Sequence, residues 1–175
     1  MLNQIKNILD KHGIKASDEL LKDLTQQFDQ STAELNEKYR RLTENSPEIT
    51  YINNLNKGAL YWSSKIKDIL GFDPKNIVED TSEWTKSLHP EDVPKIDKVL
   101  KNIIVGKTYE IEYRIYDINK NLHWFYDRIF NVYKKDGDLI LEGIISDITE
   151  RKKAEEQLKN QNILLNELNA TKDKF

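Results

Sequence analysis

The sequence predicts an α+β domain, built from antiparallel hairpins with helices gathered on one face, and a helical segment on each side of it. All three Trp, all four Pro and five of the six Gly fall between residues 46 and 149. Within that range, short strand and helix patterns precede three long strands joined by tight turns, which is typical of α+β domains. Both flanks instead repeat apolar residues at helical spacing. We therefore predict a helical segment at 1–45, a globular domain at 46–149 and a helix at 150–175.

The composition of the 175 residues excludes several classes of protein. The formal net charge is −3, which gives no electrostatic footprint for nucleic acid. The chain has no apolar stretch long enough to span a bilayer, and its first residues lack the apolar region of a secretory signal. It contains no Cys, which excludes disulfides, thiolate metal sites and Cys nucleophiles. We expect a cytoplasmic protein with no membrane segment in this chain.

The N-terminal flank predicts two helices. Apolar residues at helical spacing stop at Gly13, and Ser17 is a suitable N-cap for a second helix. Pro47 disfavours a helical conformation at the residue before it, so this helix should end near Asn45. Between these ends, apolar side chains recur at alternating steps of three and four, with two polar interruptions, as in a coiled coil: Leu21, Leu24, Phe28, Leu35 and Leu42.

The C-terminal flank shows the same spacing over residues 150–175. Neither apolar stripe is wide enough to make a helix stable by itself in water. Each helix therefore packs either on its own domain or on a second copy of the chain. We predict a homodimer formed through one set of apolar residues on these two helices: Leu21, Leu24, Phe28, Leu35, Leu158, Leu165 and Leu168.

The first half of the domain predicts two short strands and then short helices. The strands are Glu48–Asn53 and Ala59–Trp62, and the turn between them is rich in Asn and Gly. Ser63–Ser64 can cap a short helix that ends at Gly71. After it, Phe72–Pro74 begins a turn or another short helix.

The middle of the domain predicts two further helices. Ser82–Leu88 is a short helical piece that carries a tryptophan. Asp92 can then cap the longest central helix, in whose first turn Pro94 is tolerated. This helix should end at Gly106.

The second half of the domain predicts three long strands. Thr108–Asp117 alternates apolar and polar residues, Leu122–Tyr133 is rich in aromatic residues, and Leu139–Thr149 completes the set. The turns Asn119–Asn121 and Asp136–Gly137 can join them as hairpins. The helices between the two groups of strands would then cover one face of an antiparallel sheet.

Several short motifs occur in a characteristic order along the domain: Ser46–Ile49, Tyr51–Asn53, Ile69–Phe72, Leu88–Asp92, Tyr109–Arg114, His123–Trp124 and Gly143–Lys152. Together they resemble the PAS domain family, over almost the whole of residues 46 to 150. Each motif is weak alone, but their order and spacing are specific. The sequence departs from the family at Asn53, where an Asp is usual, and at His123, where an Arg is common. The resemblance implies a five-stranded antiparallel sheet cupping helices, in a sensor or dimer-forming module.

The last residues carry a second resemblance. Asn166–Phe175 is similar to the segment just before the phosphoacceptor His of sensor histidine kinases. This similarity implies the sensory piece of a kinase, cut before that His, with the kinase domain downstream in the same parent chain. It favours a kinase parent over cyclases and transcription factors, which also carry PAS domains. The sequence itself has no Gly-rich phosphate loop and no paired metal-binding His, so we predict no enzyme activity in it.

The motif Asp147-Ile148-Thr149 is the main candidate for a functional role, because it joins the last strand to the C-terminal helix. In the family that the chain resembles, Asp and Thr at this place couple the sheet to the helix by hydrogen bonds and often a salt bridge. A plain helix cap is the alternative interpretation, and the two roles are compatible.

A cavity between the sheet and the central helices would make the domain a receptor, whereas a closed apolar core would not. The residues expected to line or fill it are Trp84, Leu88, Ile96, Val99, Ile103, Ile111, Tyr113 and Ile144. Haem would need an axial His, but we expect His89 to pin a helix start and His123 to pack on the sheet or to lie exposed at the surface. The absence of Cys excludes flavin–cysteinyl photochemistry. We expect no cofactor and no metal; the alternatives are a haem-, flavin- or metabolite-binding receptor module and a protein-interaction scaffold.

Overall fold

The computed structural model describes residues 2–13 and 17–172 and divides the chain into two units, Met1–Asn45 and Ser46–Phe175. The first unit holds α1 (Leu2–Lys11) and α2 (Asp18–Glu44), which contact each other. Ser17 caps α2, because its hydroxyl accepts a hydrogen bond from the Leu20 amide at 3.2 Å. Asn45 is the C-cap of the same helix, as the sequence predicts.

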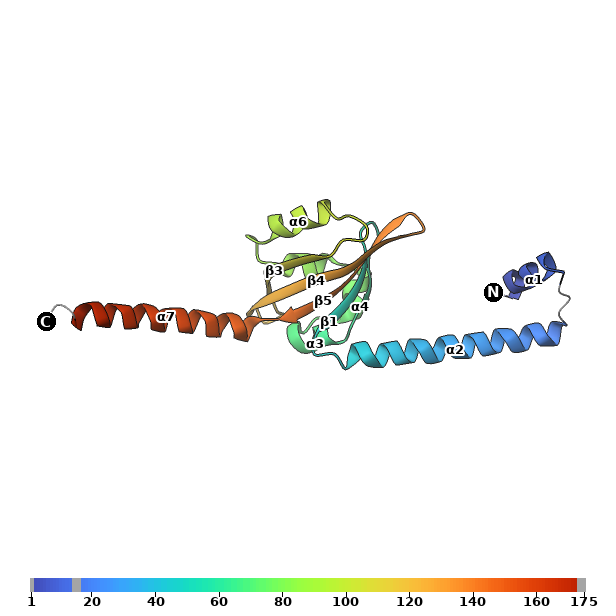
Figure 1. The fold of residues 1–175 in the computed structure, drawn as a ribbon, viewed down its shortest axis with the longest axis horizontal. Helices are drawn as coiled ribbons and strands as arrows, with labels where there is room; N and C mark the ends of the chain where they lie inside the picture. The colour runs from blue at the N-terminus through green and yellow to red at the C-terminus, as the bar shows by residue number, and fades with distance from the viewer. Residues whose placement is uncertain (1, 14–16, 173–175) are drawn as a thin grey trace. The chain divides into compact units, whose positions relative to one another are not determined.

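The second unit contains a five-stranded antiparallel sheet, which confirms the predicted fold class (Figure 1). The strand order is β2-β1-β5-β4-β3. The strands are β1 (Ile49–Asn54), β2 (Gly58–Trp62), β3 (Tyr109–Tyr116), β4 (Leu122–Lys135) and β5 (Asp138–Asp147). The last three strands form consecutive hairpins, and β5 inserts between β4 and β1. The last strand, β5, is therefore the central strand of the sheet.

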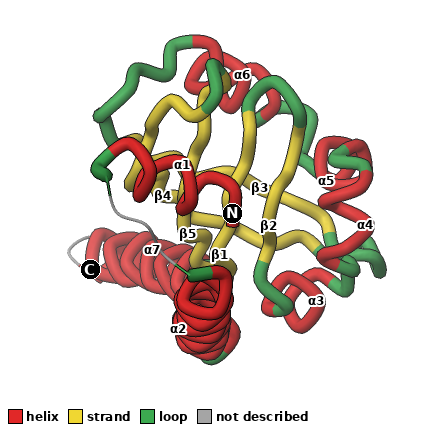
Figure 2. Tube along the Cα trace, turned by 90° about the vertical axis from the view of Figure 1, so that its right-hand side faces the viewer, coloured by secondary structure: helices red, strands yellow, loops and turns green. Residues whose placement is uncertain are grey.

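Four short helices lie between β2 and β3: α3 (Lys65–Leu70), α4 (Pro74–Glu79), α5 (Ser82–Ser87) and α6 (Val93–Lys101). In Figure 2, α3, α4 and α5 lie beside β2, and α6 lies apart from them. Gly71 ends α3 with a φ of 80°, a left-handed conformation that glycine adopts without steric cost. Asp73 caps α4, since its carboxylate accepts the Lys75 amide at 2.9 Å.

One face of the sheet and the four helices share the main apolar core. Strand residues such as Ile49, Phe125 and Ile145 are fully buried there, and Ile66 and Ile77 bury α3 and α4 against them. A smaller cluster lies at the other end of the sheet. The burial of these apolar side chains is the main favourable contribution to the folding of such a domain. The core also fixes the strand register on which the site depends.

The central helix differs from its prediction in two ways. It ends at Lys101, with Asn102 as C-cap, rather than at Gly106. Asp92 occupies the N-cap position, but its side chain does not bond the helix amides. Its carboxylate instead accepts hydrogen bonds from the backbone amide and guanidinium of Arg114 on β3. The Asp92 side chain pairs with Arg114 instead of capping the helix, because a charge-assisted bidentate contact is the stronger interaction.

Helix α7 (Thr149–Lys172) begins directly after β5 and extends away from that end of the sheet (Figure 1). Of the kinase-like segment Asn166–Phe175, residues 173–175 lie outside the described part of the chain. Among the described helices, none combines the length and the apolar character that a membrane span needs.

Candidate functional site: a helix junction and a buried cavity

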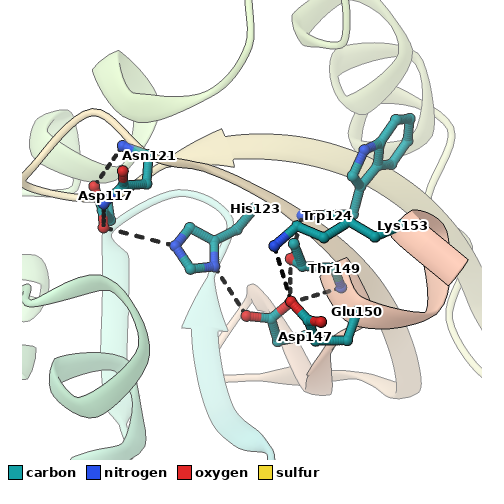
Figure 3. Close-up of polar contacts among 8 residues, drawn as sticks. All are labelled: Asp117, Asn121, His123, Trp124, Asp147, Thr149, Glu150 and Lys153. Carbon is teal, nitrogen blue, oxygen red and sulfur yellow. Dashed lines mark hydrogen bonds and ion pairs between the residues drawn. The ribbon is translucent and has the colours of Figure 1, made fainter.

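The junction between β5 and α7 is held by the Asp147 carboxylate and the Thr149 hydroxyl (Figure 3). Asp147 Oδ1 accepts the Thr149 amide at 2.9 Å and also the Thr149 hydroxyl. The same hydroxyl accepts the Trp124 amide of β4 at 2.9 Å, and the Trp124 carbonyl accepts the Ile148 amide at 2.8 Å. Thr149 and Ile148 are both buried. The first turn of α7 is therefore fixed to the neighbouring strand β4 as well as to its own strand.

A histidine extends this junction to the β3–β4 turn (Figure 3). His123 Nδ1 lies 2.9 Å from Asp147 Oδ2, and Nε2 lies 3.7 Å from Asp117 Oδ2. Asp117 organises the turn, since its Oδ1 accepts the backbone amides of Asn119 and Asn121 at 2.8 and 2.7 Å. The prediction that His123 packs on the sheet or lies at the surface did not include this polar role. Over the described residues, no group of three His, Asp or Glu side chains has the arrangement of a metal site.

Charged side chains on the outer face of the sheet hold the start of α7 from a second direction. Lys152 Nζ lies 2.6 Å from Glu112 Oε2 and 5.2 Å from the centre of the Trp124 ring. Arg151 Nη2 donates to Glu112 Oε1 at 2.9 Å, and the Arg114 guanidinium lies 5.4 Å from the same Trp124 ring. The hydrogen bond from Lys152 lowers the pKa of Glu112. Helix α7 therefore contacts both β3 and β4.

A cavity of about 90 Å³ lies between the sheet and helices α5 and α6. One charged side chain among its lining residues is Asp127 on β4, which is 9% exposed. The Tyr51 hydroxyl donates to Asp127 Oδ1 at 2.9 Å, and the Tyr113 hydroxyl lies 3.4 Å from Oδ2. Burial raises the pKa of Asp127 to about 7, although both tyrosine hydrogen bonds act to lower it. Burial likewise raises the pKa of both tyrosines well above their ordinary value.

Gly143 on β5 makes room for this arrangement. It pairs with Tyr51 across the strands, and a Cβ at this position would overlap the Tyr51 ring. The tyrosine can therefore lie flat over the sheet and reach Asp127 only because position 143 has no side chain.

We expect Gly143→Ala to lower the free energy of unfolding by about 1–3 kcal/mol, because the added methyl group must displace a buried ring. Urea unfolding followed by tryptophan fluorescence measures this loss. In a Tyr51→Ala background the same glycine substitution should lose less than half as much, because the overlapping ring is gone. An equal loss in both backgrounds would contradict the steric explanation.

Five of the eight residues predicted to line or fill a pocket do line the cavity: Trp84, Ile96, Val99, Ile111 and Tyr113. Leu88 belongs to the main core and Ile103 packs on the second cluster, so both fill the interior rather than line the cavity. The prediction for Ile144 is wrong. Side chains alternate along a strand, and its fully buried neighbour Ile145 occupies the inner face of β5.

The residues predicted for the dimer helices fall into two groups. Leu21 is 1% exposed within the N-terminal unit, so its side chain is already covered and is not free for a partner. The others are between 41% and 60% exposed on α2 and α7: Leu24, Phe28, Leu35, Leu158, Leu165 and Leu168. These six side chains leave apolar surface exposed on the two helices, and a dimer that covers this surface remains a prediction.

Sequence reasoning missed Asp127 and Tyr51 as partners in the cavity. A signal for Asp127 was present, since it lies in phase with the apolar residues Phe125 and Ile129, two positions away on each side. A charged residue on the inward face of a strand is rare unless it is paired or functional. Tyr51 had no such signal, because its reach depends on the register that places Gly143 opposite it.

Comparisons with known proteins agree with this architecture. Residues 59–145 match the family model described as PAS fold. The methyl sulfide methyltransferase-associated sensor of Methanosarcina acetivorans is 30% identical over 99 residues, which are 55% of this chain but only 10% of that protein. The chain thus spans about a tenth of the length of the curated relative it matches.

Solved structures show the same fold. The PAS domain of an HTR-like protein from Haloarcula marismortui has a TM-score of 0.60 at 15% identity, covering 70% of this chain and 99% of that one. A sensory box histidine kinase/response regulator from Burkholderia thailandensis has a TM-score of 0.57 at 24% identity, covering 74% and 98%. The strand order, the helices on one face and the family match lead to one conclusion: this chain contains a PAS domain.

Proposed function

We propose that the chain is the signal-sensing and dimerising module of a two-component sensor histidine kinase. In this proposal a change in the PAS core passes through Asp147-Ile148-Thr149 to α7. Two α7 helices from a homodimer then rotate or shift against each other, as packed elements with two arrangements can. The observation that carries the proposal is the Thr149 hydroxyl, which bonds Asp147 on one side and the Trp124 amide on the other.

The route from core to helix is short in the structure. Trp124 and Asp127 lie on the same strand, three residues apart, and β4 pairs with β5 along most of its length. In this proposal a shift of β4 at the cavity moves the Trp124 amide, to which the Thr149 hydroxyl is bonded. Because Lys152 and Arg151 also contact Glu112 on β3, a relative movement of the two strands would tilt α7.

The kinase assignment is supported by the sequence near the end of α7 and by the comparisons. Asn166–Phe175 resembles the segment that precedes a phosphoacceptor His, and the similar protein from Burkholderia thailandensis is described as a histidine kinase. The Methanosarcina acetivorans relative is described as a sensor. Sequencing the gene of the natural protein beyond codon 175 tests the assignment. A phosphoacceptor His box supports it, and a cyclase or transcription-factor domain contradicts it.

Pulsed electron–electron double resonance on the intact chain, which measures the distance between two spin labels, tests transmission through the junction. The chain has no Cys, so Asn160→Cys places a single spin label on each α7, at an exposed position. We expect the interhelix distance distribution to differ between pH 6 and pH 8, because Asp127 changes charge in this interval. In the Thr149→Val variant the difference should disappear, since valine can neither accept the Trp124 amide nor donate to Asp147.

Thr85→Val is the matched control, because the Thr85 hydroxyl donates locally, to the carbonyl of the N-cap residue Thr81 at 3.1 Å. It should keep the full difference between the two pH values. A distance distribution that is the same at both pH values in the parent chain would contradict core-to-helix transmission. A pH difference that persists in Thr149→Val would contradict the role of Thr149.

A second candidate function is a receptor for a small molecule, and the cavity of about 90 Å³ favours it. Sites for drug-sized ligands are about 300–1,000 Å³, so this cavity suits a molecule of few atoms rather than a haem or a flavin. Neither His89 nor His123 is among its lining residues. A visible absorbance spectrum of the purified protein tests this: a colourless protein agrees with a small ligand, and a Soret or flavin band contradicts it.

A further inference from the structure

The cavity combines a buried carboxyl group with an apolar aromatic wall. Among the residues that the structure describes, no Lys, Arg or His forms an ion pair with Asp127, although it is nine-tenths buried. Each carboxylate oxygen has one tyrosine hydroxyl nearby and keeps a lone pair for another donor. Burying a charge without a partner is costly, and ionisable groups in such environments are concentrated at functional sites.

Four aromatic rings that line the cavity form a connected series around this carboxyl. Tyr51 stacks on Trp62 with ring centres 5.2 Å apart, and Trp62 contacts Trp84 at 4.7 Å. Trp84 then meets Tyr113 edge-on at 6.1 Å. All four rings are among the lining residues. The faces of aromatic rings attract cations, and Trp does so most strongly.

We propose that this cavity binds a small organic ammonium ion, with its cationic nitrogen at the Asp127 carboxylate and its alkyl groups against the four rings. The inference rests on the proposed sensing function and names the chemical class of its ligand. A buried carboxylate and aromatic walls both favour a positive charge, and the described lining residues supply no cation that would attract an anion. A zwitterionic amino acid would place its own carboxylate beside Asp127 or in an apolar wall.

The volume of the cavity limits the size of the ligand. A cavity of about 150 Å³ in another protein holds one benzene, so about 90 Å³ suits an ion of a few heavy atoms. Methylammonium and trimethylammonium are in this range. Methylammonium can donate hydrogen bonds to both carboxylate oxygens, whereas trimethylammonium has one N–H and more apolar surface for the rings.

Isothermal titration calorimetry of the full chain at pH 8 with methylammonium and trimethylammonium chloride tests the proposal. Sodium chloride at equal ionic strength is the salt control, and tert-butanol is a neutral molecule of similar size and shape to trimethylammonium. We expect saturable binding of at least one ammonium ion and none of sodium. Asp127→Asn should weaken this binding about 10–100-fold, which is the usual worth of a hydrogen bond to a charged group. Asp97→Asn, an exposed carboxylate on α6, should leave it unchanged.

The pH dependence gives a second signature. The ionisable groups that face the cavity are Asp127 and the hydroxyls of Tyr51 and Tyr113. Burial raises the pKa of both tyrosines well above the ordinary value, so neither hydroxyl changes charge between pH 6 and pH 8. A cation binds the ionised carboxylate, so affinity should fall about tenfold per pH unit below the Asp127 pKa of about 7. Above that pH it should level off, and in Asp127→Asn the dependence should vanish.

Two variants keep the test independent of folding defects. Far-UV circular dichroism checks that the Asp127→Asn variant is folded. Trp84→Leu removes one aromatic ring and leaves the carboxylate, so this variant should bind trimethylammonium several-fold more weakly. Equal binding of tert-butanol, or unchanged binding by Asp127→Asn, overturns the proposal, as does the lack of any ammonium binding at tens of millimolar. Those results leave transmission through Thr149 untouched, because the spin-label distances measure it separately. Conversely, ammonium binding with unchanged spin-label distances supports the ligand class and contradicts the coupling.

Discussion

Asp127→Asn is expected to stabilise the protein at pH 8, by about 4 kcal/mol in the free energy of unfolding. Burial raises the pKa of the Asp127 carboxyl from its ordinary value of 3.8 to about 7, and each pKa unit corresponds to about 1.4 kcal/mol. At pH 8 the folded parent chain holds a buried negative charge with no cationic partner among the described residues. Asparagine has nearly the same shape, still accepts the Tyr51 hydroxyl and carries no charge.

The sign of the effect follows from the direction of the pKa change. Below about pH 4, Asp127 is protonated in both the folded and unfolded states and costs nothing. As pH rises from 4 to 7, the unfolded chain ionises while the folded chain keeps its proton, so the parent loses stability. The two proteins should therefore be similar near pH 4, diverge up to pH 7 and keep a constant difference above it.

Urea unfolding of both proteins from pH 4 to pH 9 measures this difference. Comparing the two cancels the opposite contributions of other carboxyls, such as Asp138, whose hydrogen bond to Lys57 helps to lower its pKa to about 2. Asp97→Asn is the control and should show no pH-dependent gain. An Asp127→Asn variant that is equally stable or less stable at pH 8 would show that the carboxylate has a compensating partner.

This expected gain bears on what the carboxyl is for. If its replacement stabilises the protein, the Asp127 carboxyl does not support folding at pH 8, as is the case for groups that destabilise a fold at a functional site. The ammonium ion proposed above would supply the missing positive charge, so its binding and the stability penalty have the same physical origin. Methylammonium or trimethylammonium at millimolar concentration and pH 8 should accordingly raise the free energy of unfolding of the parent chain and leave that of Asp127→Asn unchanged.

The sequence was sufficient for the parts of the fold that depend on local pattern. Alternation in Thr108–Asp117 predicts β3, and the turn residues Asp136–Gly137 predict the hairpin between β4 and β5. Ser17 predicts the start of α2 because its hydroxyl acts within one helical turn. These features need only residues that are close together along the chain.

The features that the sequence did not predict depend on register between distant strands. Asp92 looks like a helix cap until the fold brings Arg114 beside it, 22 residues later. Tyr51 and Asp127 are 76 residues apart, and their hydrogen bond also requires Gly143 on a third strand. Leu21 fits a heptad as well as Leu24 does, but α1 packs on α2 in the N-terminal unit, where Leu21 is buried. Periodicity cannot distinguish an intrachain partner from a second copy.

The double substitution Leu158→Lys/Leu165→Lys is expected to convert the chain from a dimer to a monomer. Each residue is more than half exposed on α7, and the two lie seven residues apart on one side of the helix. Burying a leucine is worth about 1.5–3 kcal/mol, and a dimer would bury four of them. Their loss, with four added positive charges, should raise the dissociation constant at least a thousandfold.

Ile163→Lys is the matched control, because Ile163 is also exposed on α7 but lies two residues from Leu165, on the opposite side of the helix. Light scattering at tens of micromolar should give about twice the chain mass of 20.6 kDa for the parent and for Ile163→Lys. The double variant should give the single mass. If it stays dimeric, the apolar stripe of α7 is not the interface, and Leu24, Phe28 and Leu35 on α2 become the surface to mutate. If the parent itself is monomeric, then sensing by this module cannot act through paired helices, and the junction at Thr149 would have to move a single α7 against another domain of its parent chain.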